Sequence, residues 1–182
     1  MAVDTTYTSP PTLARAAGQT LPYANYEDLL SDMQHVAGTT GHIGARVYNS
    51  SSFSVNNATG TVLTFNSERY DTDPNGNIHS TSVDTGRLTI QTTGKYLVFF
   101  TGEYAADPDG YREFAFRLDG ITFIAAMRVP ALASGVTRIA FGTVYDLNAS
   151  SYLEVLAEHT AGAALNVVAG GNYSLEFGCA KV

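Results

Sequence analysis

RLTIQTTGKYLVFFTGEY, residues 87–104, holds the longest apolar run of the chain and its clearest two-residue periodicity. Successive side chains of a strand face opposite sides of a sheet, so the alternating set that begins at Tyr96 is predicted to line a core. The other set, which begins at Lys95, passes from buried to exposed positions. Gly94 supplies the permissive backbone that a turn before Tyr96 needs. The stretch therefore predicts a buried hairpin whose second strand is central to the fold.

The composition favours an all-β protein over a helical one. Charged residues make up 15% of the 182 residues and apolar residues 45%, so Ser, Thr, Asn and Gly must cover much of the surface. Such a surface is typical of a strand-rich domain with many turns, and the length fits one domain with an appendage. The net charge of −7, with only 10 Lys and Arg residues, offers no electrostatic footprint for nucleic acid or an anionic membrane. We expect neither partner, and no apolar run is long enough for membrane insertion.

Residues 1–44 are predicted to form a separate N-terminal segment. Its beginning contains Pro10-Pro11 and no periodicity, which indicates an extended arm. A short helix is predicted to begin near Pro22 and to end at Gly38, where a glycine-rich hinge leads to Gly44. Packing of this helix on the β domain and a role as a short oligomeric stalk are both open. The apolar seam of the helix is Tyr26, Leu29, Met33 and Val36.

The beginning of the chain also bears on its location. No basic stretch followed by an apolar one occurs there, so we expect no secretory signal and synthesis in a cytoplasm.

Residues 45–182 alternate short apolar strands with turns. Asp119-Gly120, for example, is a two-residue hairpin signal between two apolar segments. About ten antiparallel strands with connections of mixed length indicate a two-sheet sandwich of the jelly-roll type. The predicted strands lie near residues 46–48, 52–55, 61–65, 87–91, 95–104, 111–118, 122–128, 136–147, 151–159, 164–168 and 173–180.

One loop is similar to part of a calcium site. Asp71, Asp73, Asn75 and Asn77 place oxygen ligands at alternate positions, with a glycine at the sixth. Ser82 stands where such a loop has its bidentate Glu, so we favour a turn rich in Asp and Asn and keep calcium as the alternative. No other cofactor is expected, because the single Cys and the four scattered His residues lack the spacing of a zinc site.

The sequence gives no support for an enzyme. It contains neither a Gly-x-Ser-x-Gly elbow nor a phosphate-binding glycine loop before a helix. Glu154 and Glu158 share one face of a predicted strand, but their spacing is wide for the paired carboxylates of a glycosidase. We therefore expect a protein without catalytic activity, with a carbohydrate-active enzyme as the weaker alternative.

The β region contains, in order, ARVYNSSSFSV, TVLTFNSERYDTD, GRLTIQTTGKYLVFF, GYREFAFRLDG, YLEVLAEHTAG and YSLEFGCAKV. This succession, over roughly residues 45–182, resembles the jelly roll shared by complement globular heads and tumour necrosis factor. The N-terminal segment, with Thr8-Ser-Pro-Pro-Thr12 and the helix sequence from Tyr26, is similar to tailed-bacteriophage structural proteins. The resemblance implies a homotrimer with its threefold axis along the sandwich. It also implies a place on the virion surface, with residues 1–44 joined to other virion proteins.

Two virion roles follow from that resemblance. The protein is expected to be a trimeric knob or spike that acts as an adhesin in host attachment, or a capsid decoration or head-fibre protein that stabilises the shell. In the first role, loops 71–82, 106–111 and 129–135 would contact a host cell-surface glycan or protein. The residues expected to bind it are Asp73, Asn75, Asp109 and Tyr111.

Tyrosine rings are expected at the subunit contacts of such a trimer. Large amphipathic rings are favoured at interfaces, although packing within one sheet explains them equally well. The rings considered for the trimer interface are Tyr104, Tyr145, Tyr152 and Tyr173.

Overall fold

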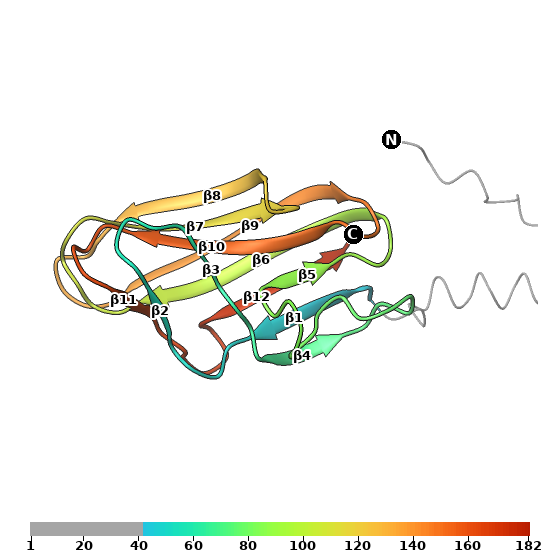
Figure 1. Ribbon diagram of the computed structural model, residues 1–182, viewed down its shortest axis with the longest axis horizontal. Coiled ribbons are helices and arrows are strands. Elements are labelled where there is room, and N and C mark those ends of the chain that lie inside the picture. Colours follow the sequence, from blue (N-terminus) through green and yellow to red (C-terminus); the bar gives the residue numbers. More distant parts are fainter. Residues whose placement is uncertain (1–41) are drawn as a thin grey trace, which may run out of the picture. The chain divides into compact units, whose positions relative to one another are not determined.

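The computed structural model describes residues 42–182, which form two antiparallel β-sheets packed face to face (Figure 1). This range contains twelve strands and no helix, so the predicted all-β sandwich is confirmed. Among the described residues there is no helix long and apolar enough to cross a membrane. The arm and the predicted helix lie outside the described residues, as does the seam of Tyr26, Leu29, Met33 and Val36.

The first sheet has seven strands, which are β1 (Gly44–Tyr48), β2 (Phe53–Val55), β4 (Ser67–Asp71), β6 (Gly94–Tyr104), β9 (Thr137–Leu147), β11 (Leu165–Val167) and β12 (Glu176–Lys181). β6 lies in the middle, as predicted. It pairs along its whole length with β9, and it also pairs with β12 and β11. Beyond β12 the sheet continues through β1 to β4, and beyond β11 it ends at β2.

The second sheet has five strands, which are β3 (Thr61–Val62), β5 (Arg87–Thr89), β7 (Tyr111–Leu118), β8 (Thr122–Pro130) and β10 (Tyr152–His159). β10 is its centre, with β7 on one side and the short strands β3 and β5 on the other, and β8 is the edge beyond β7. The turn between β7 and β8 has positive φ angles of 52° at Asp119 and 71° at Gly120. The predicted two-residue hairpin is therefore confirmed.

The core lies between the sheets and follows the predicted alternation of β6. Tyr96, Val98, Phe100 and Tyr104 are at most 2% exposed. The ring of Phe100 lies 4.6 Å, centroid to centroid, from that of Phe114 on β7, which joins the two sheets. Burial of this apolar surface is the main source of the free energy of folding.

The predicted hairpin between residues 87 and 104 is wrong. β5 and β6 belong to different sheets, because β5 pairs with β10, where Leu88 lies opposite Leu153. Ile90, which is fully buried, still lies beside the second sheet, because its N–H donates to the carbonyl of Ser151 at 2.8 Å, and residues 91–93 lead from there to β6. An alternating apolar pattern predicts which side chains are buried, but it does not specify the partner strand.

The structure also changes two other details of the prediction. β4, with the polar sequence SERYD, was not predicted; as an edge strand paired only with β1, it keeps Glu68 and Arg69 exposed. Gly44 was predicted to be part of a hinge, but it begins β1, and its carbonyl accepts a hydrogen bond from the backbone N–H of Thr72. A Cβ on Gly44 would lie 2.4 Å from the carbonyl oxygen of Cys179, so close strand packing requires glycine here.

Candidate functional site

The predicted binding loops lie at two opposite ends of the sandwich. Loop 71–82 is at the end where the described chain begins, because Asp71 lies opposite Ala45 at the start of β1. We call this the proximal end. Loops 106–111 and 129–135 meet at the other end, the distal end, where Ala131 N–H donates to the carbonyl of Gly110 (Figure 1). Asp73 and Asn75 are therefore separated from Asp109 and Tyr111, and one contact surface cannot contain all four.

The predicted calcium loop uses its carboxylates for internal hydrogen bonds. Oδ1 of Asp73 accepts from the backbone N–H of Asn75 and from the hydroxyl of Thr92, both at 2.9 Å, and the side chain is 9% exposed. Oδ2 of Asp71 accepts from His79 N–H at 2.8 Å, and burial raises the pKa of this carboxyl above its ordinary value. Residues 42–182 contain no group of three His, Cys, Asp or Glu side chains that could hold a metal ion.

The fourth predicted calcium ligand, Asn77, also takes part in a hydrogen bond within this part of the fold. Asn77 contributes its backbone carbonyl, which accepts a hydrogen bond from Gln91. The geometry thus supports the Asp- and Asn-rich turn, and calcium binding stays a prediction.

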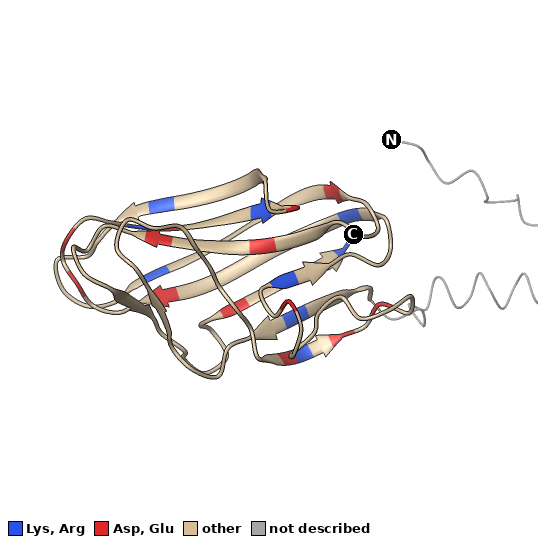
Figure 2. Ribbon diagram, viewed as in Figure 1, with Lys and Arg blue, Asp and Glu red and all other residues tan. Residues whose placement is uncertain are grey.

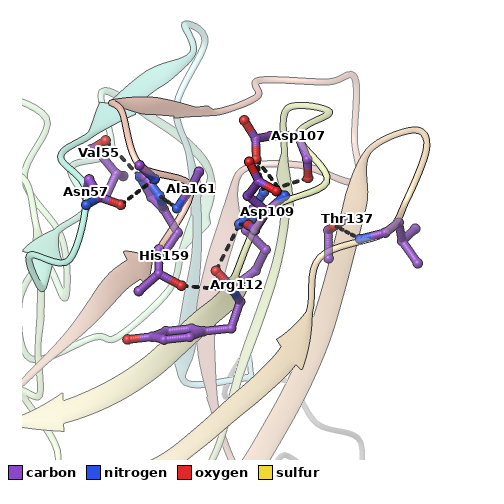
Figure 3. Close-up of polar contacts among 12 residues, drawn as sticks. Val55, Asn57, Asp107, Asp109, Arg112, Thr137, His159 and Ala161 are labelled. Carbon is purple, nitrogen blue, oxygen red and sulfur yellow. Dashed lines mark hydrogen bonds and ion pairs between the residues drawn. The ribbon is translucent and has the colours of Figure 1, made fainter.

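Arg112 organises the loop between β6 and β7 from inside the distal end. Its side chain is fully buried, and its Nη1 donates to the carbonyls of Asp109, at 2.8 Å, and Tyr111, at 3.0 Å. Nη2 donates to the carbonyl of Asp107 at 2.7 Å (Figure 3). One guanidinium thus fixes three backbone carbonyls and the shape of the loop. Sequence reasoning did not find this residue, although Arg112 belongs to the inward-facing set of Phe114 and Phe116.

His159 fixes the loops on the other side of the distal end. It lies opposite Arg112 in the β10–β7 pairing and is also fully buried. Its Nδ1 accepts from the backbone N–H of Ala161 at 3.3 Å, so Nε2 carries the proton and donates to the carbonyl of Val55 at 3.0 Å (Figure 3). Asn57 adds a bond, since its Oδ1 accepts from Gly162 N–H. The distal loops are therefore held in one conformation by buried polar groups.

The two predicted distal residues differ in their accessibility. Asp109 is exposed, whereas Tyr111 is half-buried. The Tyr111 hydroxyl donates to the carboxylate of Glu158, and the guanidinium carbon of Arg128 lies 3.9 Å from the ring centroid. One face of the Tyr111 ring is covered in this way, so Asp109 is the more accessible of the pair.

An apolar strip lies on the outer face of the first sheet. It consists of Leu97 and Val144, which are opposite each other and 40% and 55% exposed, together with half-buried Phe99 and Ala180. Gly178 keeps the strip flat, because a Cβ there would lie 2.4 Å from the Phe99 ring. We call these residues the assembly face.

Ion pairs border the assembly face at both ends. Lys95 Nζ lies 2.7 Å from an Asp146 carboxylate oxygen at one end, and Arg138 pairs with Glu103 at the other. Charges of both signs are interleaved along the strands of the sandwich (Figure 2). An apolar strip with a polar rim is the arrangement of a protein contact.

Exposed apolar side chains also occur along the edge strand β8 and its turn. Ile121 is 82% exposed, Phe123 61% and Met127 42%. Because β8 pairs only with β7, these side chains stand on an open edge of the second sheet. Residues 42–182 thus carry two different apolar surfaces, the assembly face and this edge.

The four tyrosines considered for a trimer contact occupy different environments. Tyr104 is fully buried in the core of its own chain, where its hydroxyl donates to the carbonyls of Glu113 and Glu158, and it is thereby removed from the set. Tyr145 is half-buried against the same core, and Tyr152 lies under Arg87 on the second sheet. Tyr173, 52% exposed and beside Arg138, is the one of the four that borders the assembly face.

The two carboxylates weighed for catalysis are both engaged. Oε1 of Glu154 accepts from Arg87 at 3.2 Å, and Oε2 accepts from Arg117 at 2.7 Å. Glu158 accepts from the hydroxyl of Tyr111. These contacts describe a structural charge network and give the enzyme alternative no support.

The arrangement of strands can be compared with that of solved structures. Eiger TNF from S. frugiperda matches with a TM-score of 0.58 and 15% identity, over 78% of this chain and 92% of that one. Murine APRIL at pH 5.0 matches with a TM-score of 0.55 and 12% identity, over 78% of this chain and 99% of that one. The described domain is a tumour necrosis factor-like jelly roll. At this identity the likeness concerns the fold alone.

Sequence comparison adds nothing to that assignment. No protein-family model matches the TNF-like chain, and no curated protein matches it either. The expected virion origin therefore stays a prediction.

Proposed function

We propose that this TNF-like chain is a homotrimeric binding module without catalytic activity. The observation that carries the proposal is the assembly face, where Leu97 and Phe99 on the central strand β6 and Val144 on the neighbouring β9 are partly exposed. Apolar area of this kind is stabilised when a second subunit removes it from water. The resemblance of the sequence to trimeric jelly rolls supports the number of subunits.

The two apolar surfaces support a cyclic assembly. Since the assembly face and the β8 edge with Phe123 and Met127 are different surfaces of one chain, a contact between them is heterologous. A heterologous contact that closes on itself gives a ring. In a ring of three subunits with its axis along the sandwich, every chain buries both its assembly face and its β8 edge.

The distal loops are the proposed contact surface for a partner. Arg112 and His159 hold them in one conformation, and a preformed surface loses less entropy on binding than a flexible one. Asp109 is the exposed predicted residue there. This choice follows the expectation that recognition lies away from the N-terminal segment.

The module is proposed to sit on the surface of a tailed-phage virion, assembled in the host cytoplasm, with residues 1–44 contacting other virion proteins. The support is the similarity of that segment to phage structural proteins. Host attachment through a cell-surface glycan or protein is the favoured role, because a rigid loop surface suits recognition. Capsid decoration is the second candidate, in which residues 1–44 join the module to the shell.

Binding of the labelled full chain to intact host cells and to purified virus particles distinguishes the two roles. We expect saturable binding to cells that Asp109→Ala weakens. Asn75→Ala is the matched control at the proximal end and should bind like the wild type. A protein that ignores cells and binds particles lacking it would overturn host attachment and leave decoration.

A further inference from the structure

A small polar pocket lies on the first sheet, apart from the distal loops and the assembly face. Its volume is about 270 Å³, and it opens between the end of β1, the edge strand β4 and the turn Ala169–Asn172. Tyr48, Asn49, Ser50 and Arg69 line it from the strand side. The pocket is therefore of a size for a single small ligand rather than a polymer.

The charged side chains next to this pocket have a net positive charge. Glu176 is fully buried and accepts hydrogen bonds from two arginines, Arg46 through Nε and Arg69 through Nη2, the second at 2.8 Å. Two guanidinium groups on one carboxylate leave a net charge of +1. In a chain with a net charge of −7, this is a local site that favours an anion.

The cationic group of the pocket is held in place before any ligand binds. The guanidinium carbon of Arg69 lies 4.0 Å from the ring centroid of Tyr48, and its Nη2 also donates to the carbonyl of Gly171 at 3.1 Å. Nη2 of Arg46 donates to the carbonyl of Asn172 at 3.2 Å, which fixes the turn that closes the pocket. Such preorganisation lowers the entropy cost of binding.

Several hydrogen-bond donors at the pocket remain free. Within residues 42–182, Nη1 of Arg69 and the backbone N–H groups of Gly171 and Asn172 have no hydrogen-bond partner. The Ser50 hydroxyl accepts from Asn66, so its own proton is available. These donors suit a carboxylate, and the side chains of Asn172 and Ser50 suit neighbouring hydroxyl groups.

We infer that this pocket binds a monosaccharide that carries a carboxylate, with Arg69 as the group that contacts the acid. Nε and Nη2 of Arg69 already donate to Glu176 and Gly171, so the free Nη1 donates to the acid, and a charge-assisted hydrogen bond is stronger than a neutral one. The inference rests on the proposed attachment function, to which it adds a second contact outside the distal loops, made with an acidic surface sugar.

The test is a titration of the isotope-labelled full chain, followed by backbone amide NMR signals. Glucuronate and N-acetylneuraminate are the two acidic probes. Glucose, which has the ring of glucuronate without the carboxylate, and acetate, which has the carboxylate without the ring, are the matched controls. At least one acidic sugar shifts the amide signals of Gly170, Gly171 and Asn172 saturably, and glucose and acetate bind about tenfold more weakly or worse.

Variants separate recognition from a purely structural role of the arginine. Arg69→Gln weakens binding about tenfold, Arg69→Lys weakens it less, and Arg128→Gln, which removes another arginine stacked on a tyrosine, leaves it unchanged. If Arg69→Gln fails to fold, Ser50→Ala, at an exposed position, takes its place and weakens binding while the fold is kept.

Three results overturn the site. These are no saturable shift with either acid, equal binding of glucose, and equal binding of acetate. Binding of the same variants to host cells is measured in a separate experiment. Acid binding without cell binding retains the site and removes the attachment function, whereas cell binding that Arg69→Gln does not affect retains the function and removes the site as its determinant.

Discussion

Arg112 is the residue on which the shape of the distal loops most depends. Methionine at this position would fill a similar volume but would leave the carbonyls of Asp107 and Asp109 without their donor, while Tyr111 would keep only its bond from Thr160 N–H. We expect Arg112→Met to lower the free energy of unfolding by about 3 kcal/mol, measured by denaturant titration at one protein concentration. Arg128→Met, which breaks an exposed ion pair with Glu113, is the control and should show no comparable loss. Equal effects of the two variants would contradict the role given to Arg112.

Cys179 gives the protein a predictable response to alkali. Burial raises the pKa of its thiol from the ordinary 9.0 to about 12, so the folded state favours the neutral thiol. The contribution to stability is complete below pH 9 and is lost as the pH rises toward 12. Burial also raises the pKa of Tyr96 and Tyr104, whose ordinary value is 10.0, so their contribution begins to fall at a higher pH.

A pH series of thermal unfolding checks this expectation. Between pH 9 and pH 10 the Tm of the wild type should fall more steeply than that of Cys179→Ala, which has no thiol to titrate. The slope is the readout, because the smaller Ala side chain lowers the Tm at every pH. Parallel curves for the two proteins would show that the thiol is accessible or that its burial has no cost.

For single residues, the sequence predicted which side chains are buried better than it predicted which contacts they make. The alternation of β6 identified Tyr96, Val98 and Phe100 as core residues, because side-chain period and burial are linked directly. It also placed Tyr104 on the inward set, yet Tyr104 was considered for a subunit contact. Arg112 was missed because a charged residue in a strand is usually assigned to the surface, and its burial becomes favourable only through the carbonyls and the Asp107 carboxylate of a folded loop.

Among the strands, the sequence pattern predicted those connections that depend on local turn residues and missed those that depend on tertiary packing. The β7–β8 hairpin was predictable because its turn residues act locally, with Asp119 and Gly120 in the left-handed region. The relation of β5 to β6 was not predictable in this way, since both have apolar alternation and only tertiary packing assigns them to different sheets. β4 was missed because the polar side chains of an exposed edge strand resemble a loop.

The contact between the β6–β7 and β10–β11 loops can be tested with one substitution. Gly110 has a φ of +72°, and a Cβ on it would lie 2.1 Å from the carbonyl oxygen of Thr160. Gly110→Ala should therefore lower the Tm by more than backbone strain alone. Gly135→Ala is the matched control, because Gly135 has a φ of +88° with no atom within 4 Å of the added Cβ, and its cost should be about 1 kcal/mol. Similar Tm values for the two variants would show that the distal loops are not tightly packed.

For the whole molecule, the fold was predictable from strand spacing and turn chemistry, whereas assembly and location depend on partners.

The β domain begins its first strand at Gly44, so a chain that starts at residue 42 should contain every described strand. We expect this truncated protein to unfold cooperatively in urea and to keep its oligomeric state. Sedimentation with purified particles should show that it no longer binds them, while the full chain does. Failure of the truncated chain to fold would place residues 1–41 in the core.

The mass of the purified wild-type protein tests the proposed assembly most directly. Size-exclusion chromatography with light scattering at micromolar concentration should give three times the 19.4 kDa of one chain. Leu97→Glu, on the assembly face, should shift the mass toward the single chain, and Val83→Glu, at a 67% exposed position in the β4–β5 loop, should leave it unchanged. A wild-type mass of 19.4 kDa under these conditions would contradict the account.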